Sequence, residues 1–159
     1  HWGDTIARSF FVDTFNFYLF DKLRSCSNKT LAGVAEKALK EVAYQAQWSA
    51  EWVIRLGDGT DESHYKIQES INSLWMWSGE LFEAHPMFDK LDDSFVRFES
   101  LREVWLDKIG EVLKEATLVV PSPELWMQTG GRYGIHTSEL GFILAEMQSL
   151  ARTHPEATW

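Results

Sequence analysis

The chain has 159 residues, of which 45% are hydrophobic and 25% are charged, so its composition is that of a folded protein and excludes a disordered segment. Its net charge of −9 argues against nucleic acid or an anionic membrane surface as the main partner. The sequence has one cysteine, Cys26, and no apolar run long enough to span a bilayer. We therefore expect a cytoplasmic protein with residues 1–159 in a single domain and without an internal disulfide.

The first predicted helix runs from about Asp4 to Leu23, and its apolar side chains surround nearly the whole circumference. About twenty residues without Pro or Gly favour a helix over a strand. A helix with no polar face has to be covered on most sides, so we expect this segment to be buried.

Further helices are predicted where apolar side chains recur at helical spacing. They cover about Thr30–Leu56, Asp61–Glu83, Asp93–Ala116 and Ser138–Ala151. The second is ended by Gly57-Asp58-Gly59, because glycine tolerates the left-handed conformation that follows many helices. Long helices with short connections predict an all-α antiparallel bundle.

A bundle of long helices can hold two iron ions between paired Glu-x-x-His motifs, because residues three apart share one face of a helix. No Glu-x-x-His occurs in this sequence. Asp61-x-x-His64 is the nearest approximation, but it stands at a helix start, where capping explains the acid. Glu41 and Glu80 are interpreted as structural or exposed side chains. The sequence therefore predicts no metal in this chain.

The glycine-rich loop before the last helix is a weak candidate for binding an anion. Gly130, Gly131 and Arg132 could offer backbone amides and a cation to a phosphate, because helix N-termini attract anions. The loop lacks the spacing of a P-loop or a dinucleotide fingerprint. His136 could contact a ligand or act as a general base, but hydrogen bonding that orders the helix entry is the favoured interpretation. No nucleophile or acidic partner can be assigned to it.

Several short motifs occur in an order and spacing that are specific only when taken together. They are Asp4-Thr5-Ile6-Ala7-Arg8, Lys40-Glu41-Val42-Ala43-Tyr44, Trp52 to Ser63, Leu74-Trp75, Glu80-Leu81-Phe82, Glu115-Ala116-Thr117-Leu118, Gly130-Gly131, Gly134-Ile135-His136-Thr137, Leu144-Ala145-Glu146-Met147-Gln148 and Trp159. Over essentially all of the chain, this order resembles the family of C subunits (PaaC) of the bacterial phenylacetyl-CoA epoxidase.

The resemblance implies a ferritin-like helical fold and a non-catalytic, structural subunit. The complex is the multicomponent oxygenase that epoxidises the ring of phenylacetyl-CoA in aerobic phenylacetate breakdown. The implied partners are the catalytic A subunit, which holds the di-iron centre, and the other subunits of the complex, and the chain itself is expected to carry no cofactor. Related sequences tend to have His where this chain has Asn16 and Gln45, so these two residues, with Glu41 and Glu80, count as degenerate metal positions.

Family members also have a substantial N-terminal region before the segment that matches Asp4. The resemblance therefore implies an incomplete bundle of about five helices, without the first long helices of the family, and an oligomer instead of a monomer. Trp48, Trp52 and Trp77 fall off the main core stripes and are the candidates for partner binding, because Trp is enriched at interface hot spots. Two alternatives remain: an active ferritin-like di-metal oxidase or oxygenase, and an acyl-CoA-binding module that uses the loop at 130–134.

Overall fold

The computed structural model describes residues 1–90 and 95–158. The α-helices are α1 (Trp2–Leu23), α2 (Lys29–Gly57), α3 (Asp61–Trp75), α4 (Arg102–Glu115) and α5 (Ser138–Thr153), and the 3-10 helices are η1 (Met76–Phe82), η2 (Pro86–Lys90), η3 (Phe98–Leu101) and η4 (Gly131–Tyr133). No strand occurs in these described ranges, which confirms the all-α prediction. The chain divides into two compact units, residues 1–128 and the segment from Thr129 onward. The expectation of a single domain stays a prediction.

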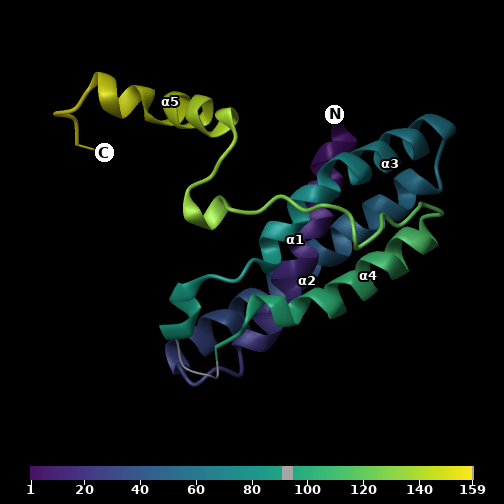
Figure 1. The fold of residues 1–159 in the computed structure, drawn as a ribbon, viewed down its shortest axis with the longest axis horizontal. Coiled ribbons are helices and arrows are strands. Elements are labelled where there is room, and N and C mark those ends of the chain that lie inside the picture. Colours follow the sequence, from purple (N-terminus) through teal and green to yellow (C-terminus); the bar gives the residue numbers. More distant parts are fainter. Residues whose placement is uncertain (91–94, 159) are drawn as a thin grey trace. The chain divides into compact units, whose positions relative to one another are not determined.

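Helix α1 is the central element of the first unit. It contacts α2, α3 and α4, and Figure 1 shows it running through the middle of this unit. Eight of its residues are buried, namely Gly3, Ile6, Ala7, Phe10, Phe11, Thr14, Phe15 and Leu23. The sequence expectation of a helix that is covered on most sides is thus confirmed, and the apolar side chains of the neighbouring helices supply the cover.

An aromatic cluster forms the centre of the core of the first unit. The ring of Phe11 lies 5.7 Å from that of Trp75 and 5.6 Å from that of Trp105, and the two indoles are 5.6 Å apart. Both indole N–H groups are satisfied: Trp105 Nε1 donates to the carbonyl oxygen of Phe11 at 2.9 Å, and Trp75 Nε1 donates to that of Ser122 at 3.1 Å. Burial of rings with satisfied polar atoms is strongly stabilising. The Trp105 bond also fixes the register of α4 on α1, and the Trp75 bond ties the end of α3 to the segment that follows α4.

The corner between α2 and α3 is built from short-range hydrogen bonds. Thr60 is the N-cap of α3, where its side chain accepts from the amide of Ser63, while the Ser63 hydroxyl accepts from the amide of Thr60. The imidazole Nδ1 of His64 lies 2.7 Å from the carbonyl oxygen of Gly57 at the end of α2. His64 therefore ties two helix ends together, which agrees with the structural interpretation of Asp61-x-x-His64.

Two helix boundaries differ from the sequence expectation. The third helix is α-helical only to Trp75 and continues as η1, where the backbone meets the end of the first unit. There the amide of Gln128 donates to the carbonyl oxygen of Met76 at 2.8 Å, and a Cβ on Gly79 would collide with Met127. The fourth α-helix begins at Arg102, directly after η3, and the residue before η3, Arg97, has an extended backbone. The start expected from the sequence, Asp93, lies outside the described residues.

The turn between α1 and α2 holds Cys26, which is only 4% exposed. Its Sγ lies 3.5 Å from the carbonyl oxygen of Asn28, and Asn28 caps α2 by accepting from the amide of Leu31 at 3.0 Å. The cysteine is a free thiol. It therefore acts here as a small buried side chain beside a helix cap.

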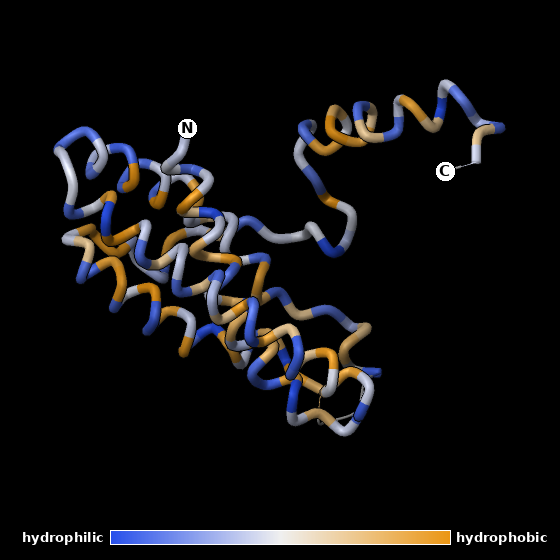
Figure 2. Tube along the Cα trace, turned by 180° about the vertical axis from the view of Figure 1, so that it is seen from behind, coloured by the Kyte–Doolittle hydropathy of each residue, from blue (hydrophilic) through white to orange (hydrophobic). Residues whose placement is uncertain are grey.

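The second unit contains η4 and α5. Gly130 and Gly134 flank η4 with φ of 101° and 82°, values that favour glycine. Helix α5 has Thr137 at its N-cap without a side-chain cap bond, and none of its residues is buried. Figure 2 shows hydrophobic segments alternating with hydrophilic ones along it. Over the described residues, neither this helix nor any other is long and apolar enough to cross a membrane.

Candidate functional site

A polar seam, formed by Asp13, Asn16, Gln45 and Ser49, runs between α1 and α2. The two helices are antiparallel, since the ring of Trp2 near the start of α1 lies 6.2 Å from that of Trp52 near the end of α2. The carboxyl group of Asp13 lies close enough to the hydroxyl of Ser49, across the pair, for Ser49 to lower its pKa. Asn16 follows Asp13 by one turn and Gln45 precedes Ser49 by one turn, so both lie on the same side of this contact.

Asp13 is the desolvated acid of the seam. Burial raises the pKa of its carboxyl group above the usual range, against the hydrogen bond from Ser49 and the positive charge of Arg8, which both lower it. Ser49 is fully buried, and its hydroxyl also lies 3.0 Å from the carbonyl oxygen of Gln45. Because the Ser49 hydroxyl donates to the carbonyl oxygens of Gln45 and Ala46 in its own helix, its proton is not fully available to Asp13, and Ser49 offsets the desolvation of that carboxyl group only in part.

The described residues do not fit a di-iron centre. In residues 1–90 and 95–158, no three His, Cys, Asp or Glu side chains are grouped so that they could hold a metal ion. Of the degenerate positions, Glu41 and Gln45 are exposed, whereas Asn16 and Glu80 are half-buried. Glu80 lies on η1, outside the seam. That this chain binds no metal stays a prediction.

Sequence reasoning missed Asp13. The motif sought was an acid followed three residues later by His. Asp13-x-x-Asn16 has the same helical spacing, but an amide side chain stands where the motif has His. A search that accepted Asn or Gln in place of His would have found this pair. Glu41, which the sequence singled out instead, lies on the exposed side of α2.

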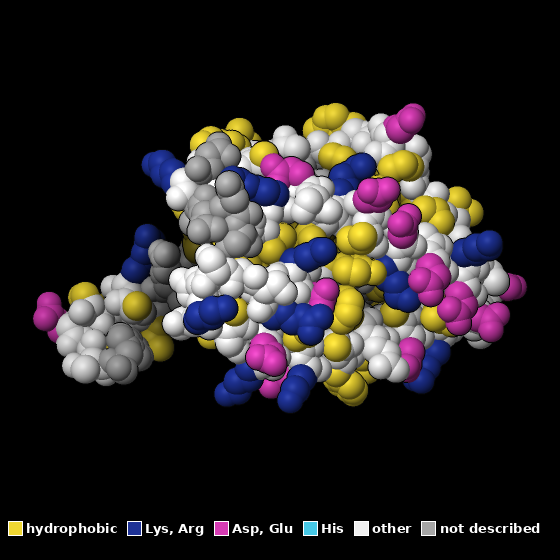
Figure 3. Space-filling model, turned by 90° about the horizontal axis from the view of Figure 1, so that it is seen from below, with side chains coloured by type: hydrophobic (Ala, Val, Ile, Leu, Met, Phe, Trp, Pro, Cys, Tyr) yellow, Lys and Arg dark blue, Asp and Glu magenta, His cyan; other side chains and the backbone are white. Residues whose placement is uncertain are grey.

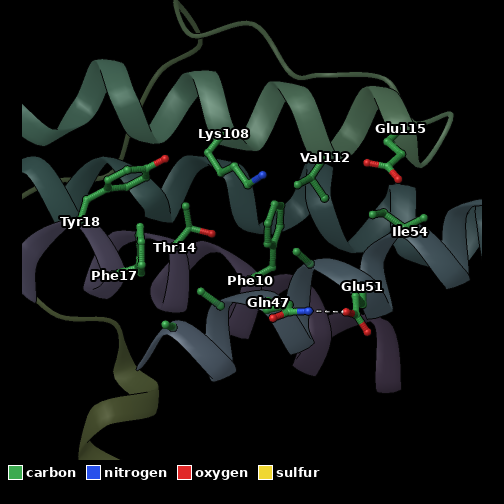
Figure 4. A pocket seen from close by; sticks show the side chains of 13 residues that line it. Phe10, Thr14, Phe17, Tyr18, Gln47, Glu51, Ile54, Lys108, Val112 and Glu115 are labelled. Atoms are coloured by element: carbon green, nitrogen blue, oxygen red, sulfur yellow. Dashed lines mark hydrogen bonds between the residues drawn. The ribbon is translucent and has the colours of Figure 1, made fainter. Parts of the chain in front are cut away.

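A cavity of about 260 Å³ opens between α1, α2 and α4. Its apolar wall comes from the side chains of Phe10, Phe17, Ala43, Ala46, Ala50, Ile54 and Val112. Figure 4 shows polar groups on both sides of the opening, with Lys108 and Glu115 on α4 and the Gln47–Glu51 pair on α2. Gln47 Nε2 donates to Glu51 at 2.9 Å, and Lys108 Nζ is 3.1 Å from Glu111. The cavity can accept an apolar group, but its lining offers no activated nucleophile.

The three tryptophans proposed for partner binding differ in their surroundings. Trp52 is half-buried and makes edge-to-face contacts with Trp2 and Trp48. The guanidinium carbon of Arg55 lies over its ring, 5.5 Å from the ring centre. Trp48 is 36% exposed and Trp77 is 41% exposed. Figure 3 shows apolar side chains interspersed with both signs of charge on one face of the molecule. Trp48 and Trp77 therefore present more free ring surface than Trp52.

The loop proposed for anion binding uses its amides internally. The N–H groups of Tyr133 and Ile135 donate to the carbonyl oxygen of Gly130 at 2.9 and 3.0 Å, and that of Gly134 donates to Gly131 at 3.2 Å. Arg132 is half-buried and His136 is exposed. Three amides of the loop are therefore paired within a compact turn, and a binding role for Arg132 or His136 stays a prediction.

The whole chain, residues 1–159, matches the family described as phenylacetic acid catabolic protein. It is also 39% identical over 161 residues to the C subunit of 1,2-phenylacetyl-CoA epoxidase from Escherichia coli (strain K12). That match covers 100% of the chain but 64% of the relative, so the chain spans less than two thirds of the relative's length. The match confirms the resemblance that the ordered motifs indicate, and the chain belongs to the phenylacetic acid catabolic protein family.

Proposed function

We propose that this protein is a structural, non-catalytic subunit of a multicomponent phenylacetyl-CoA oxygenase in phenylacetate catabolism. The observation that carries the proposal is the 39% identity to the C subunit of an epoxidase, which extends over 100% of the chain. Its partners are the catalytic subunit, which supplies the di-iron centre, and the other subunits of the complex. We place this assembly in the cytoplasm, which suits a chain with one buried free thiol.

The contact with the catalytic subunit is proposed to use Trp48 and Trp77. Large aromatic rings that are partly exposed on rigid helices make favourable interface anchors, because they bury much area at a low cost in side-chain entropy. Trp48 lies on α2 directly before the buried Ser49, and Trp77 lies on η1 directly before the buried Ser78. Trp52 packs against Trp48 through their edge-to-face contact and so helps to hold its ring in place.

The test is co-expression of the full-length protein with the other subunits, followed by measurement of the dissociation constant and of ring epoxidation. Trp48→Ala and Trp77→Ala are each expected to weaken assembly by about tenfold or more, as for anchors at an interface centre. Tyr65→Ala is the matched control, since Tyr65 is an aromatic residue that is 65% exposed on α3. It is expected to leave assembly unchanged.

The same assay separates a structural role from a direct part in the chemistry. Glu41→Ala and Asp13→Asn are expected to leave turnover of the assembled complex unchanged. The desolvated carboxyl group of Asp13 is the one observation that favours the rival, in which this subunit takes part in proton transfer. Loss of turnover in an assembled Asp13→Asn complex would contradict the structural role.

A further inference from the structure

The cavity between α1, α2 and α4 exists because α2 presents small side chains to it. Ala43, Ala46 and Ala50 follow one another at spacings of three and four residues, so they share one face of the helix. The buried side chains of Phe10 on α1 and Val112 on α4 also line the space of about 260 Å³, which larger residues on α2 would fill. An engineered apolar cavity of about 150 Å³ holds benzene, so this one has room for a ring with a short substituent.

One buried polar side chain in this cavity, Thr14, is left without a hydrogen bond. Thr14 is only 3% exposed, and its hydroxyl has no partner among the described residues. A threonine inside a helix commonly donates to the carbonyl oxygen four residues earlier, and Thr14 does not. Every fully enclosed side-chain oxygen or nitrogen of the described residues has a partner, so the Thr14 hydroxyl opens onto the cavity that it lines. Figure 4 shows this side chain between the rings of Phe17 and Phe10, on the side of α1 that faces Lys108.

The charged side chains of the lining are more exposed than Thr14. Lys108 is half-buried with its Nζ 3.1 Å from Glu111, whereas Glu51 and Glu115 are exposed. An anion would meet two carboxylates and a lysine that is already paired. Any charged group taken in beside Thr14 would lose its water against apolar walls. The group that the Thr14 hydroxyl can accommodate is therefore an uncharged one.

We propose that this cavity binds a small uncharged molecule with an apolar ring and one hydroxyl or carbonyl group, which forms a hydrogen bond with Thr14 Oγ1. The ring packs against the alanines of α2, Phe10 and Val112, and the polar group pairs the buried hydroxyl. An alcohol and a carbonyl both fit, because a threonine hydroxyl can donate and accept. The site does not rest on the proposed function, since neither Trp48 nor Trp77 lines the cavity.

The test titrates the full-length protein with benzyl alcohol and with toluene, which has the same ring without the hydroxyl, and follows amide shifts by nuclear magnetic resonance. Both are expected to bind saturably, with the largest shifts at the residues that line the cavity. Thr14→Val keeps the shape of the side chain but removes its hydroxyl. It is expected to weaken the binding of benzyl alcohol by about threefold to tenfold without weakening that of toluene. Thr5→Val is the matched control, because Thr5 is exposed on the same helix outside the lining, and it is expected to change neither affinity.

A second arm examines the space and the charge of the ligand. Ala46→Leu fills the cavity and is expected to abolish the binding of both probes, with circular dichroism and urea unfolding as checks of the fold. Benzoate and benzylammonium are expected to bind about tenfold or more weakly than benzyl alcohol. The absence of saturable benzyl alcohol binding, an unchanged affinity in Thr14→Val, binding that survives Ala46→Leu, or tighter binding of either charged probe overturns the proposal. If Ala46→Leu does not fold, the comparison of Thr14→Val with Thr5→Val decides alone.

Discussion

Helices α1 and α5 are both rich in large apolar side chains, yet they have opposite environments. Eight residues of α1 are buried by the helices around it, whereas none of α5 is buried. The two sequences also differ, because apolar residues surround α1 but form one stripe on α5. An all-round apolar helix needs a core, whereas a helix with one stripe can fold against a single surface. The comparison teaches that the pattern of apolar residues, more than their number, sets how many sides of a helix have to be covered.

The largest effect is expected from the centre of the first unit. Trp105→Ala removes an indole that is 1% exposed and leaves the carbonyl oxygen of Phe11 without its donor. We expect a loss of about 3–5 kcal/mol in the free energy of unfolding, measured in urea. Trp126→Ala, at a position that is 68% exposed, is the control and is expected to change it by less than about 0.5 kcal/mol. Similar losses for both variants would mean that the aromatic cluster does not hold the unit together.

A smaller effect is expected where α2 meets α4. A Cβ on Gly57 would collide with the backbone carbonyl of Ala116, so Gly57→Ala is expected to destabilise the protein by about 1–3 kcal/mol. Gly110→Ala is the matched helical variant, because no atom lies within 4 Å of a Cβ built there. It is expected to stabilise the protein by up to about 1 kcal/mol. Thermal unfolding of the two variants in opposite directions would confirm the close approach.

In the second unit, a Gly→Ala substitution is expected to change the stability of α5 alone. Gly141 on α5 also has no atom near its built Cβ, so Gly141→Ala favours the helix by about 1 kcal/mol. Slower amide exchange in α5, with an unchanged melting temperature of residues 1–128, is the expected result. A change in the melting temperature of the first unit would show that the two units unfold together.

The smallest effect concerns Asp13 and depends on pH. Because the pKa of its carboxyl group in the folded state lies above the ordinary value of 3.8, the folded state holds the proton longer, and stability falls as the pH rises through the folded-state pKa. Asp13→Asn removes this loss and is expected to be more stable at pH 7 by less than about 1 kcal/mol, since partial solvent exposure screens the effect. Glu62→Gln should change stability in the opposite direction, because Lys66 lowers the pKa of Glu62. Urea unfolding at about pH 3 and pH 7 measures both.

The fold was largely predictable from the sequence, because apolar periodicity sets the helices, and the side chains of Asn28 and Thr60 cap the starts of two of them. The expected left-handed glycine after α2 was wrong, because neither Gly57 nor Gly59 has a positive φ and Asp58 is the C-cap. What escaped prediction depends on contacts between distant segments. The change from α3 to η1 follows from the approach of Met127 and Gln128, which lie far along the chain from it. Asp13 is half-buried beside Ser49 of another helix, a contact that the spacing of residues along one helix cannot reveal. The exposure of Trp48 and Trp77 agrees with their proposed role.

The reactivity of the single thiol can be used to measure local opening of the turn between α1 and α2. Cys26 is the one cysteine of the sequence, and it is 4% exposed beside the cap of α2. A thiol reagent can reach it only when this hairpin opens, so the labelling rate reports the opening free energy at that end of the molecule. Labelling much faster than global unfolding would identify the α1–α2 turn as a separate cooperative unit. The same reaction, followed as partners are added, would show whether assembly closes the hairpin without any engineered probe.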